Sequence, residues 1–355
     1  MKTYGVIMAG GGGTRFWPLS RQEQPKQLLN LSGNDLMVNE TIDRIATFTD
    51  KKDIFIVTNE TQVPKMQEAT ATRIAKDHIL AEPSARNTSA CIGYAALEIV
   101  KKYSDGIMCI FPSDHFIKNQ PEFTRVLKEA IRIAEEEDKL ITLGITPTFP
   151  STGYGYIKFD KTDDSLAKQV VEFKEKPDEQ TARAYVASGE YAWNSGMFIW
   201  KASTILAAFE ELLPEVSACL QEIGRAMNTP EEKEVIQKVY TTIPSISIDY
   251  GIMEKSPNVK VISAEFGWND VGSWDNLGVL YDADAQGNVV AGKHIGIDTT
   301  DSIVYSKKRL ITTIGVEHLI VVETEDAILV CDKDRAQDVK KIVDRLKEDG
   351  NEEYL

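Results

Sequence analysis

Short apolar runs alternate with amphipathic stretches along the first part of the chain. Residues 4–9, 54–57 and 107–111 are almost entirely apolar, which is typical of strands buried on both faces of a parallel sheet. Residues 89–102 and 121–137 carry apolar side chains at helical spacing. Strands that alternate with helices form βαβ units. The pattern therefore predicts an α/β fold with a Rossmann-like, mostly parallel sheet and right-handed crossovers.

The alternation continues less regularly through the middle of the chain. Three further strands are predicted, at residues 139–145, 156–159 and 170–174. Three further helices are predicted, at residues 178–188, 203–213 and 230–240. Ligands bind to parallel sheets beyond the carboxyl ends of the strands, so residues that directly follow a strand are the first candidates for chemistry.

From about residue 288 the pattern changes to short β-rich runs separated by Gly, Asp and Glu. These runs comprise residues 289–291, 303–305, 310–314, 319–322 and 328–331. They predict a small all-β domain. Residues 334–348 are predicted to form a final helix with one apolar face, which consists of Val339, Ile342, Val343 and Leu346. We therefore divide the chain into a first domain at residues 1–285 and a β-rich domain at residues 286–355.

Composition limits the classes of function. The 355 residues include 40 Lys and Arg against 55 Asp and Glu, a formal net charge of −15. Such an acidic chain is not a general binder of nucleic acid or anionic membranes, which require a basic surface. The four cysteines are scattered without CxxC spacing, so neither a disulfide framework nor a zinc site is expected. We find no signal peptide and no long apolar run, and expect a soluble, cytoplasmic protein.

The clearest chemical signal directly follows the first predicted strand. It is the run Gly10, Gly11, Gly12, Gly13, Thr14 and Arg15. Glycines allow the backbone to turn its N–H groups inward, and successive inward N–H groups form an anion site suited to a nucleotide's phosphates. The run is neither a Walker loop nor a GxGxxG motif with its acidic partner. A flexible loop would contain the same glycines, so the run alone leaves the function open.

Two cations lie near this run in the sequence. Arg15 adjoins the glycines, and Lys26 follows eleven residues later in the sequence QPKQ. A guanidinium and an ammonium beside a phosphate site would supply the positive charge that the acidic chain otherwise lacks. Each residue alone would ordinarily be a solvated surface charge.

The combined motif resembles the sugar-nucleotide pyrophosphorylases, whose N-terminal signature is GGxGTRxxPLS followed by PK. Five further motifs appear in family order: EPSARNT at 82–88, PSDH at 112–115, EKP at 175–177, WNSGMF at 193–198 and WNDVGSW at 268–274. The resemblance covers essentially the whole chain and is greatest to the branch that joins guanine nucleotides to mannose 1-phosphate. It implies that residues 1–285 are a nucleotidyltransferase domain. For residues 286–355 it implies a left-handed β-helix involved in homodimer formation, although the strands alone are equally compatible with a small sandwich.

The implied reaction converts GTP and α-D-mannose 1-phosphate to GDP-mannose and pyrophosphate. The resemblance assigns the triphosphate to the glycine run, with Arg15 and Lys26 as catalytic cations, and assigns Mg²⁺ to Asp114 and Asp270. Two carboxylates together with phosphate oxygens would form the hard oxygen site that Mg²⁺ prefers. A single loop Asp is usually a cap or turn residue, and sequence spacing cannot pair these two. His115 is not needed as a base, because a sugar phosphate is mostly ionised at neutral pH.

The sugar-phosphate side rests on a second group of residues. The resemblance implies that Glu175 holds sugar hydroxyls and that Lys176 holds the sugar phosphate. Asn194 carries both a donor and an acceptor, which suits a hydroxyl group, but it could equally be a turn residue. Gly153 and Gly155 would allow close approach of the sugar. Asp249 resembles a family position near the sugar phosphate, although a helix N-cap explains it equally well.

The nucleotide base is assigned mainly by resemblance. Glu82, or backbone carbonyls near Pro83, could accept hydrogen bonds from guanine N1–H and N2–H₂. Arg86 would more naturally meet phosphate. The remaining nucleotide-site candidates are Asn87, Thr88 and Ser113, of which Asn87 and Thr88 could instead cap the following helix.

Two alternatives remain open at the level of sequence. One is a nucleotidyltransferase of the same fold that uses another nucleotide or another hexose 1-phosphate. The other is a non-catalytic regulatory subunit that senses GDP-mannose, against which the intact Arg15, Lys26, Asp114 and Asp270 argue. Some relatives carry a fused cupin-type isomerase domain. The chain ends at residue 355, so we expect no mannose-6-phosphate isomerase activity.

Overall fold

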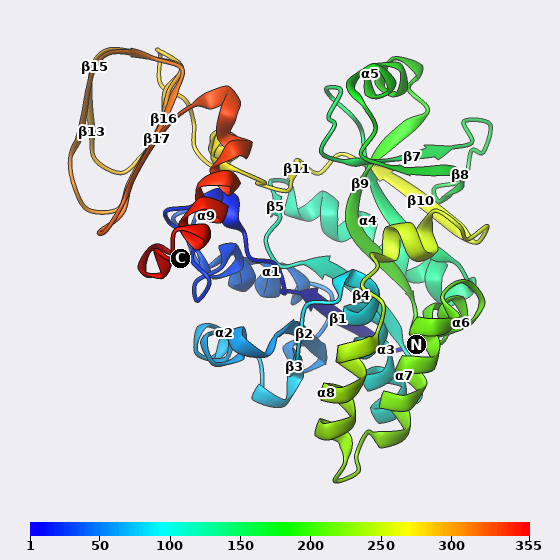
Figure 1. Ribbon diagram of the computed structural model, residues 1–355. Coiled ribbons are helices and arrows are strands. Elements are labelled where there is room, and N and C mark those ends of the chain that lie inside the picture. The colour runs from blue at the N-terminus through cyan, green and yellow to red at the C-terminus, as the bar shows by residue number, and fades with distance from the viewer. The chain divides into compact units, whose positions relative to one another are not determined.

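The computed structural model describes residues 1–355, which form two compact units (Figure 1). Unit 1 comprises Met1–Gly10, Ile42–Ser113 and Ile117–Trp268, and unit 2 comprises Gly11–Thr41, Asp114–Phe116 and Asn269–Leu355. The short strands β5 (Phe116–Ile117) and β11 (Trp268–Asn269) lie where the chain passes from one unit to the other, as does helix α1 (Met37–Ile45). The domain boundary between residues 285 and 286 stays a prediction.

A nine-stranded sheet forms the centre of unit 1, in the order β3-β2-β1-β4-β9-β6-β10-β8-β7. Its strands are β1 (Thr3–Met8), β2 (Ile54–Asn59), β3 (Ile79–Glu82), β4 (Ile107–Pro112), β6 (Leu140–Ile145), β7 (Gly155–Phe159), β8 (Lys168–Glu175), β9 (Tyr191–Lys201) and β10 (Val259–Ala264). Strand β9 is antiparallel to β4 and β6, and β8 is antiparallel to β10 and β7. All strands except β8 and β9 therefore run in one direction, which confirms the mostly parallel sheet.

Seven helices belong to unit 1 alone. They are α2 (Val63–Thr70), α3 (Asn87–Tyr103), α4 (Gln120–Glu136), α5 (Glu179–Ser188), α6 (Ala202–Leu212), α7 (Pro214–Ala226) and α8 (Glu232–Thr242). Helix α3 lies against α6 and α7, and Figure 1 shows α8 beside α7. The apolar face predicted for α3, including Ile92 and Ile99, is buried in the core of unit 1. None of the helices is both long and apolar enough to cross a membrane.

Unit 2 contains two small sheets whose strands alternate along the chain. One sheet has the order β12-β14-β16-β17, formed by Val289–Ala291, Ile303–Ser306, Leu319–Glu323 and Ile328–Asp332. The other pairs β13 (His294–Thr300) in parallel with β15 (Ile311–Glu317). Because β12, β14 and β16 are also parallel, the chain coils from one sheet to the other. The predicted β-rich domain is therefore confirmed, and the hand of its coil stays a prediction.

The final helix differs from the prediction in two respects. The α-helix α9 spans Val339–Glu348, whereas Lys333–Asp338 form a 3-10 helix in which Arg335 has non-helical backbone angles. Asp332 caps that 3-10 helix by accepting a hydrogen bond from the N–H of Asp334. Ile342 is exposed, although Val339 and Val343 are buried. The apolar face is therefore narrower than the sequence predicts.

Candidate functional site

The glycine loop in unit 2 is fixed against the segment that carries Lys26. Gly13 has a φ of +59°, and a Cβ atom there would lie 2.2 Å from the Cβ of Lys26. Only glycine fits both constraints. The Gln27 side chain donates a hydrogen bond of 3.0 Å to the carbonyl of Gly11. By contrast, the position that a Cβ would take on Gly11 or Gly12 is open.

Lys26 is the centre of the site in unit 2. It starts the 3-10 helix Lys26–Leu28 and is only 4% exposed. Its Nζ lies 2.8 Å from Oδ2 of Asp114 and donates a hydrogen bond of 2.6 Å to the backbone carbonyl of Asp270. Burial alone would raise the pKa of Asp114, but the charges of Lys26 and His115 hold that pKa below its ordinary value.

Asp270 reaches this site because its motif is anchored to the N-terminal segment. Trp274 is fully buried, packs against Phe16 and donates from Nε1 to the backbone carbonyl of Trp17 at 2.9 Å. The Asp270 carboxylate lies close to Gly272, because a Cβ atom on Gly272 would be 3.1 Å from Oδ2 of Asp270. Two motifs more than 240 residues apart are thus brought together within unit 2.

The two acids at this site carry the class of ligand atom that magnesium binds. Asp114 and Asp270 both lie at the Lys26 ammonium, one through its carboxylate and the other through its main chain. Their side chains offer oxygen donors only, which is the ligand class that Mg²⁺ prefers. Arg15, which extends from the 3-10 helix Thr14–Phe16, is exposed and makes no ion pair.

A second site in unit 1 unites three residues predicted for the sugar phosphate. The Asn194 amide on β9 donates 2.8 Å to Oδ1 of Asp249 and 3.3 Å to Oε1 of Glu175. Glu175 ends β8, opposite Gly155 on β7, and a Cβ on Gly155 would lie 2.0 Å from the Glu175 carboxylate. Glycine is therefore needed at position 155, because any side chain there would occupy the place of the Glu175 carboxylate.

Asp249 is not a helix N-cap. It begins the short π-helix Asp249–Met253, but its side chain faces Asn194 instead of capping backbone N–H groups. Burial, and next the charge of Glu175, raise the pKa of Asp249 to about 6. Lys176 has a φ of +47°, is exposed, and its Nζ lies 3.4 Å from Glu175. Gly153 is exposed, and its N–H donates to the hydroxyl of Ser151 at 3.2 Å.

The segment predicted to bind the base also lies in unit 1. Glu82, at the end of β3, is buried and accepts a 3.2 Å hydrogen bond from the hydroxyl of Tyr240. Burial raises the pKa of Glu82 to about 7, although this hydrogen bond opposes the rise. Tyr240 was not among the predicted site residues, because a tyrosine inside an amphipathic helix is typical of a core.

Two residues that follow Glu82 in the sequence, Arg86 and Thr88, form hydrogen bonds to backbone groups of distant segments. Arg86 donates from Nε and Nη2 to the carbonyls of Tyr240 and Thr241, so part of its guanidinium holds the end of α8. The hydroxyl of Thr88 accepts from the N–H of Ile248, which precedes Asp249. This hydrogen bond connects the segment predicted to bind the base with the segment that carries Asp249. Pro83 lines a cavity of about 520 Å³, and Asn87 is exposed with a φ of +64°. The N–H of the buried Ser113 donates to the carbonyl of Met8, where β1 and β4 end. Gly10 lies beside the Glu82 carboxylate.

Known proteins resemble the chain over almost its whole length. Residues 4–286 match the family model "Nucleotidyl transferase", and residues 292–346 match "MannoseP isomerase/GMP-like beta-helix domain". A mannose-1-phosphate guanylyltransferase of Klebsiella pneumoniae is 38% identical over 98% of this chain and 75% of its own length. The xanthan biosynthesis protein XanB of Xanthomonas campestris pv. campestris (strain B100) is 39% identical over 98% of this chain and 74% of its own length.

A solved structure resembles the chain in architecture and also in sequence. A protein named mannose-1-phosphate geranyltransferase from Thermus thermophilus matches with a TM-score of 0.89 and 31% identity, covering 98% of this chain and 100% of its own. The resemblance to sugar-nucleotide pyrophosphorylases that the motifs indicated is thereby confirmed. The chain belongs to the nucleotidyl transferase family.

Proposed function

We propose that the chain is a mannose-1-phosphate guanylyltransferase, which converts GTP and α-D-mannose 1-phosphate to GDP-mannose and pyrophosphate. One structural observation carries the chemistry: the buried Lys26 ammonium is held between the Asp114 carboxylate and the Asp270 backbone carbonyl, while the Lys26 backbone packs against Gly13. The relatives of that name, which match the chain over nearly its full length, support the choice of substrates.

In the proposed reaction an oxygen of the mannose phosphate attacks the α-phosphorus of GTP in line. A new P–O bond forms, and the bond to the β-phosphate oxygen breaks with release of pyrophosphate. The attacking phosphate is already mostly ionised at neutral pH, so no general base is required. Catalysis then depends on position and on charge neutralisation.

The residues of unit 2 would handle the triphosphate. Backbone N–H groups of residues 11–14 bind phosphate oxygens, and the exposed Arg15 is available to join them. Lys26 neutralises the negative charge that develops at the α-phosphate. Asp114 and Asp270 would hold Mg²⁺, which supplies further neutralisation of phosphate charge when bound.

The residues of unit 1 would select the sugar and the base. Glu175, Asn194 and Asp249 already form a hydrogen-bonded group that can exchange partners with sugar hydroxyls. Lys176, exposed beside Glu175, would bind the sugar phosphate. Glu82 supplies a carboxylate acceptor for the N–H groups of guanine when it is ionised.

We also propose that the protein acts as a homodimer in the cytoplasm, where its nucleotide substrate is found. Strands β13 and β15 form a two-stranded ribbon with three exposed isoleucines, Ile295, Ile297 and Ile314. A two-stranded ribbon is marginally stable alone, and a group of exposed apolar side chains is typical of an interaction site. A second copy would bury these side chains.

The function is tested by pyrophosphate release from purified protein with Mg²⁺, four nucleoside triphosphates and several hexose 1-phosphates. We expect release with GTP and mannose 1-phosphate at a rate above every other pair. A higher rate with another pair would replace the proposed substrates. Binding of GDP-mannose without any release would instead identify a regulatory subunit.

A further inference from the structure

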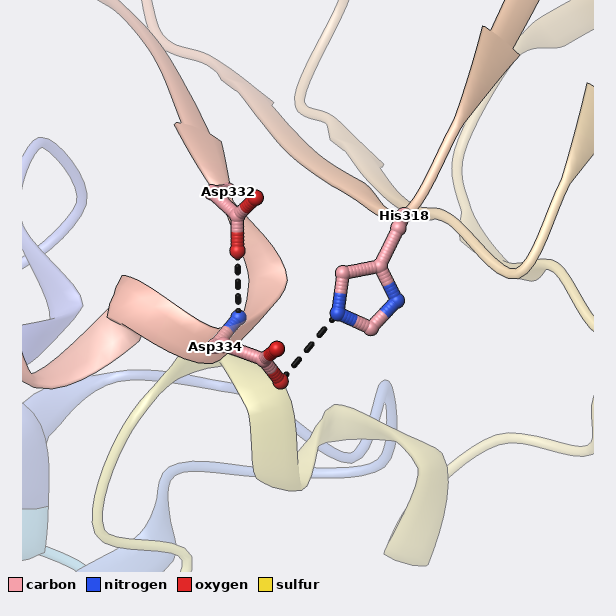
Figure 2. Close-up of side chains that lie close together, drawn as sticks. All are labelled: His318, Asp332 and Asp334. Atoms are coloured by element: carbon pink, nitrogen blue, oxygen red, sulfur yellow. Dashed lines mark hydrogen bonds and ion pairs between the residues drawn. The ribbon is translucent and has the colours of Figure 1, made fainter.

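A cluster of potential metal ligands lies in the β-rich part of unit 2, formed by residues that none of the motifs includes. His318 occupies the turn between β15 and β16, Asp332 ends β17, and Asp334 lies in the following 3-10 helix. One ligand atom from each residue can be chosen so that all three lie within 4.8 Å of one another (Figure 2). The β15–β16 turn and the segment that follows β17 therefore meet at one place.

The backbone holds His318 firmly at this position. Its N–H donates 3.2 Å to the carbonyl of Thr300, and its own carbonyl accepts 3.0 Å from the N–H of Lys333. These hydrogen bonds connect His318 to the end of β13 and to the residue that follows β17. The side chain therefore projects from a fixed point and not from a free loop.

A carboxylate orients the imidazole for ligation. Oδ2 of Asp301 lies 2.6 Å from Nδ1 of His318, and the charge of Asp301 is itself balanced by Lys333. In metal sites a ligating histidine commonly donates its second ring N–H to a carboxylate, which fixes the tautomer and leaves Nε2 for the ion. Here Nε2 faces the Asp334 carboxylate at 3.1 Å, as Figure 2 shows.

The donor atoms suit a transition metal, as does the separation of His318 and Asp334. Ligands about 2.0–2.2 Å from Zn²⁺ at a tetrahedral angle lie about 3.4 Å apart, close to the separation of His318 and Asp334. Asp332 uses one oxygen to accept from the N–H of Asp334 at 2.9 Å, which leaves its second oxygen available. Two carboxylates balance the charge of a divalent ion, and the imidazole favours zinc over magnesium or calcium.

We propose that His318, Asp332 and Asp334 bind a divalent transition-metal ion of the Zn²⁺ type, with water at the remaining positions. The ion joins the β15–β16 turn to the segment after β17 and so stabilises the coil. The scattered cysteines predict no zinc site, but this site uses no cysteine. Its ligands are also different from the pair Asp114 and Asp270, to which Mg²⁺ was assigned.

The proposal is tested by equilibrium dialysis of the full-length protein against ZnCl₂, with excess MgCl₂ to occupy the magnesium site, followed by metal analysis. Two variants remove ligands. His318→Asn places a residue that tolerates a φ of +59° at the turn, and Asp334→Asn changes a largely exposed side chain. His294→Asn is the matched control, because that histidine lies on β13 and its Nε2 is bonded to Thr313 instead of a carboxylate.

We expect about one equivalent of Zn²⁺ in the wild type and in the control, with binding weakened at least about tenfold in both ligand variants. Zn²⁺ should also raise the Tm of the wild type and control but not of the variants. If the wild type retains no Zn²⁺ beyond the amount bound by both ligand variants, the His318 cluster is only a network of ion pairs and the proposal is wrong.

Discussion

At the scale of single residues, the candidate site depends on a few buried charges that hold one another in place. Lys26 is almost fully buried in a chain with a net charge of −15, and it is stabilised by Asp114 and by a carbonyl. A buried ammonium without such partners would be very costly. The sequence suggested Lys26 through its motif, but the partners could not be predicted from spacing.

Asp270→Asn should lower turnover by about 10²–10³-fold, because it removes one carboxylate charge from the proposed Mg²⁺ site. The contact between Lys26 and Asp270 uses the backbone carbonyl, so this substitution should leave that contact in place. Steady-state pyrophosphate release and thermal unfolding measure the two effects. The control is Asp282→Asn, an exposed acid in the same part of the chain. Turnover within about threefold of the wild type would remove Asp270 from the metal site.

Asp249→Asn should change how the stability of the free protein depends on pH. The pKa of Asp249 is about 6 in the folded protein against an ordinary value of 3.8, so the folded state binds more protons between these values. Wild-type stability should therefore fall as pH rises from about 4 to about 6. Asparagine can still accept the hydrogen bond from Asn194 but does not ionise.

Each pKa unit corresponds to about 1.4 kcal/mol, so Asp249→Asn at pH 7 should be more stable than the wild type by at most about 3 kcal/mol. The difference should vanish near pH 4. Urea unfolding of both proteins across this pH range measures it. A difference that stays constant with pH would mean that Asp249 titrates normally.

At the scale of elements, the pattern predicted those whose periodicity is strong. The apolar runs that became β1, β2 and β4, and the amphipathic α3 and α4, were all found within a few residues. The pattern did not predict β3, β9, β10, β13, α1, α2 or α7. Of these, β9 and β13 contain glycine, asparagine or threonine in the strand, which weakens the signal. Strand β9 is the element that brings Asn194 to Glu175, so this part of the site could not be built from the sequence alone.

The glycine loop offers a comparison between adjacent positions. Gly13→Ala should destabilise the protein by about 2–4 kcal/mol, because alanine is strained at a φ of +59° and its Cβ would overlap Lys26. Gly12→Ala should be nearly neutral for stability, because the nearest atom to its Cβ lies 3.9 Å away. Chemical unfolding distinguishes them. Equal effects of the two substitutions would show that the loop is not seated on Lys26.

At the scale of the whole molecule, each compact unit is built from segments that lie far apart in the sequence. Gly11–Thr41 and Asp114–Phe116 belong to the same unit as Asn269–Leu355, because Phe16, Trp17 and Leu31 share a core with Trp274 and Ile320. Hydrophobic periodicity describes neighbours in sequence only, so it predicts the class of fold without this grouping. The motifs indicated that Lys26 and Asp270 act together, and the shared core supplies the physical reason.

The same unit carries the surface on which the proposed dimer depends. Ile314 on β15 is 71% exposed, so Ile314→Arg should not disturb the folded monomer, but it would place a charge inside a dimer interface. We expect sedimentation velocity to show a dimer for the wild type and a monomer for this variant at equal concentration. Val171→Arg is the control, because Val171 on β8 is 62% exposed in unit 1 and should leave the dimer intact. If Ile314→Arg remains dimeric, the ribbon of β13 and β15 is not the interface. If the wild type is itself monomeric, the proposed dimer is wrong.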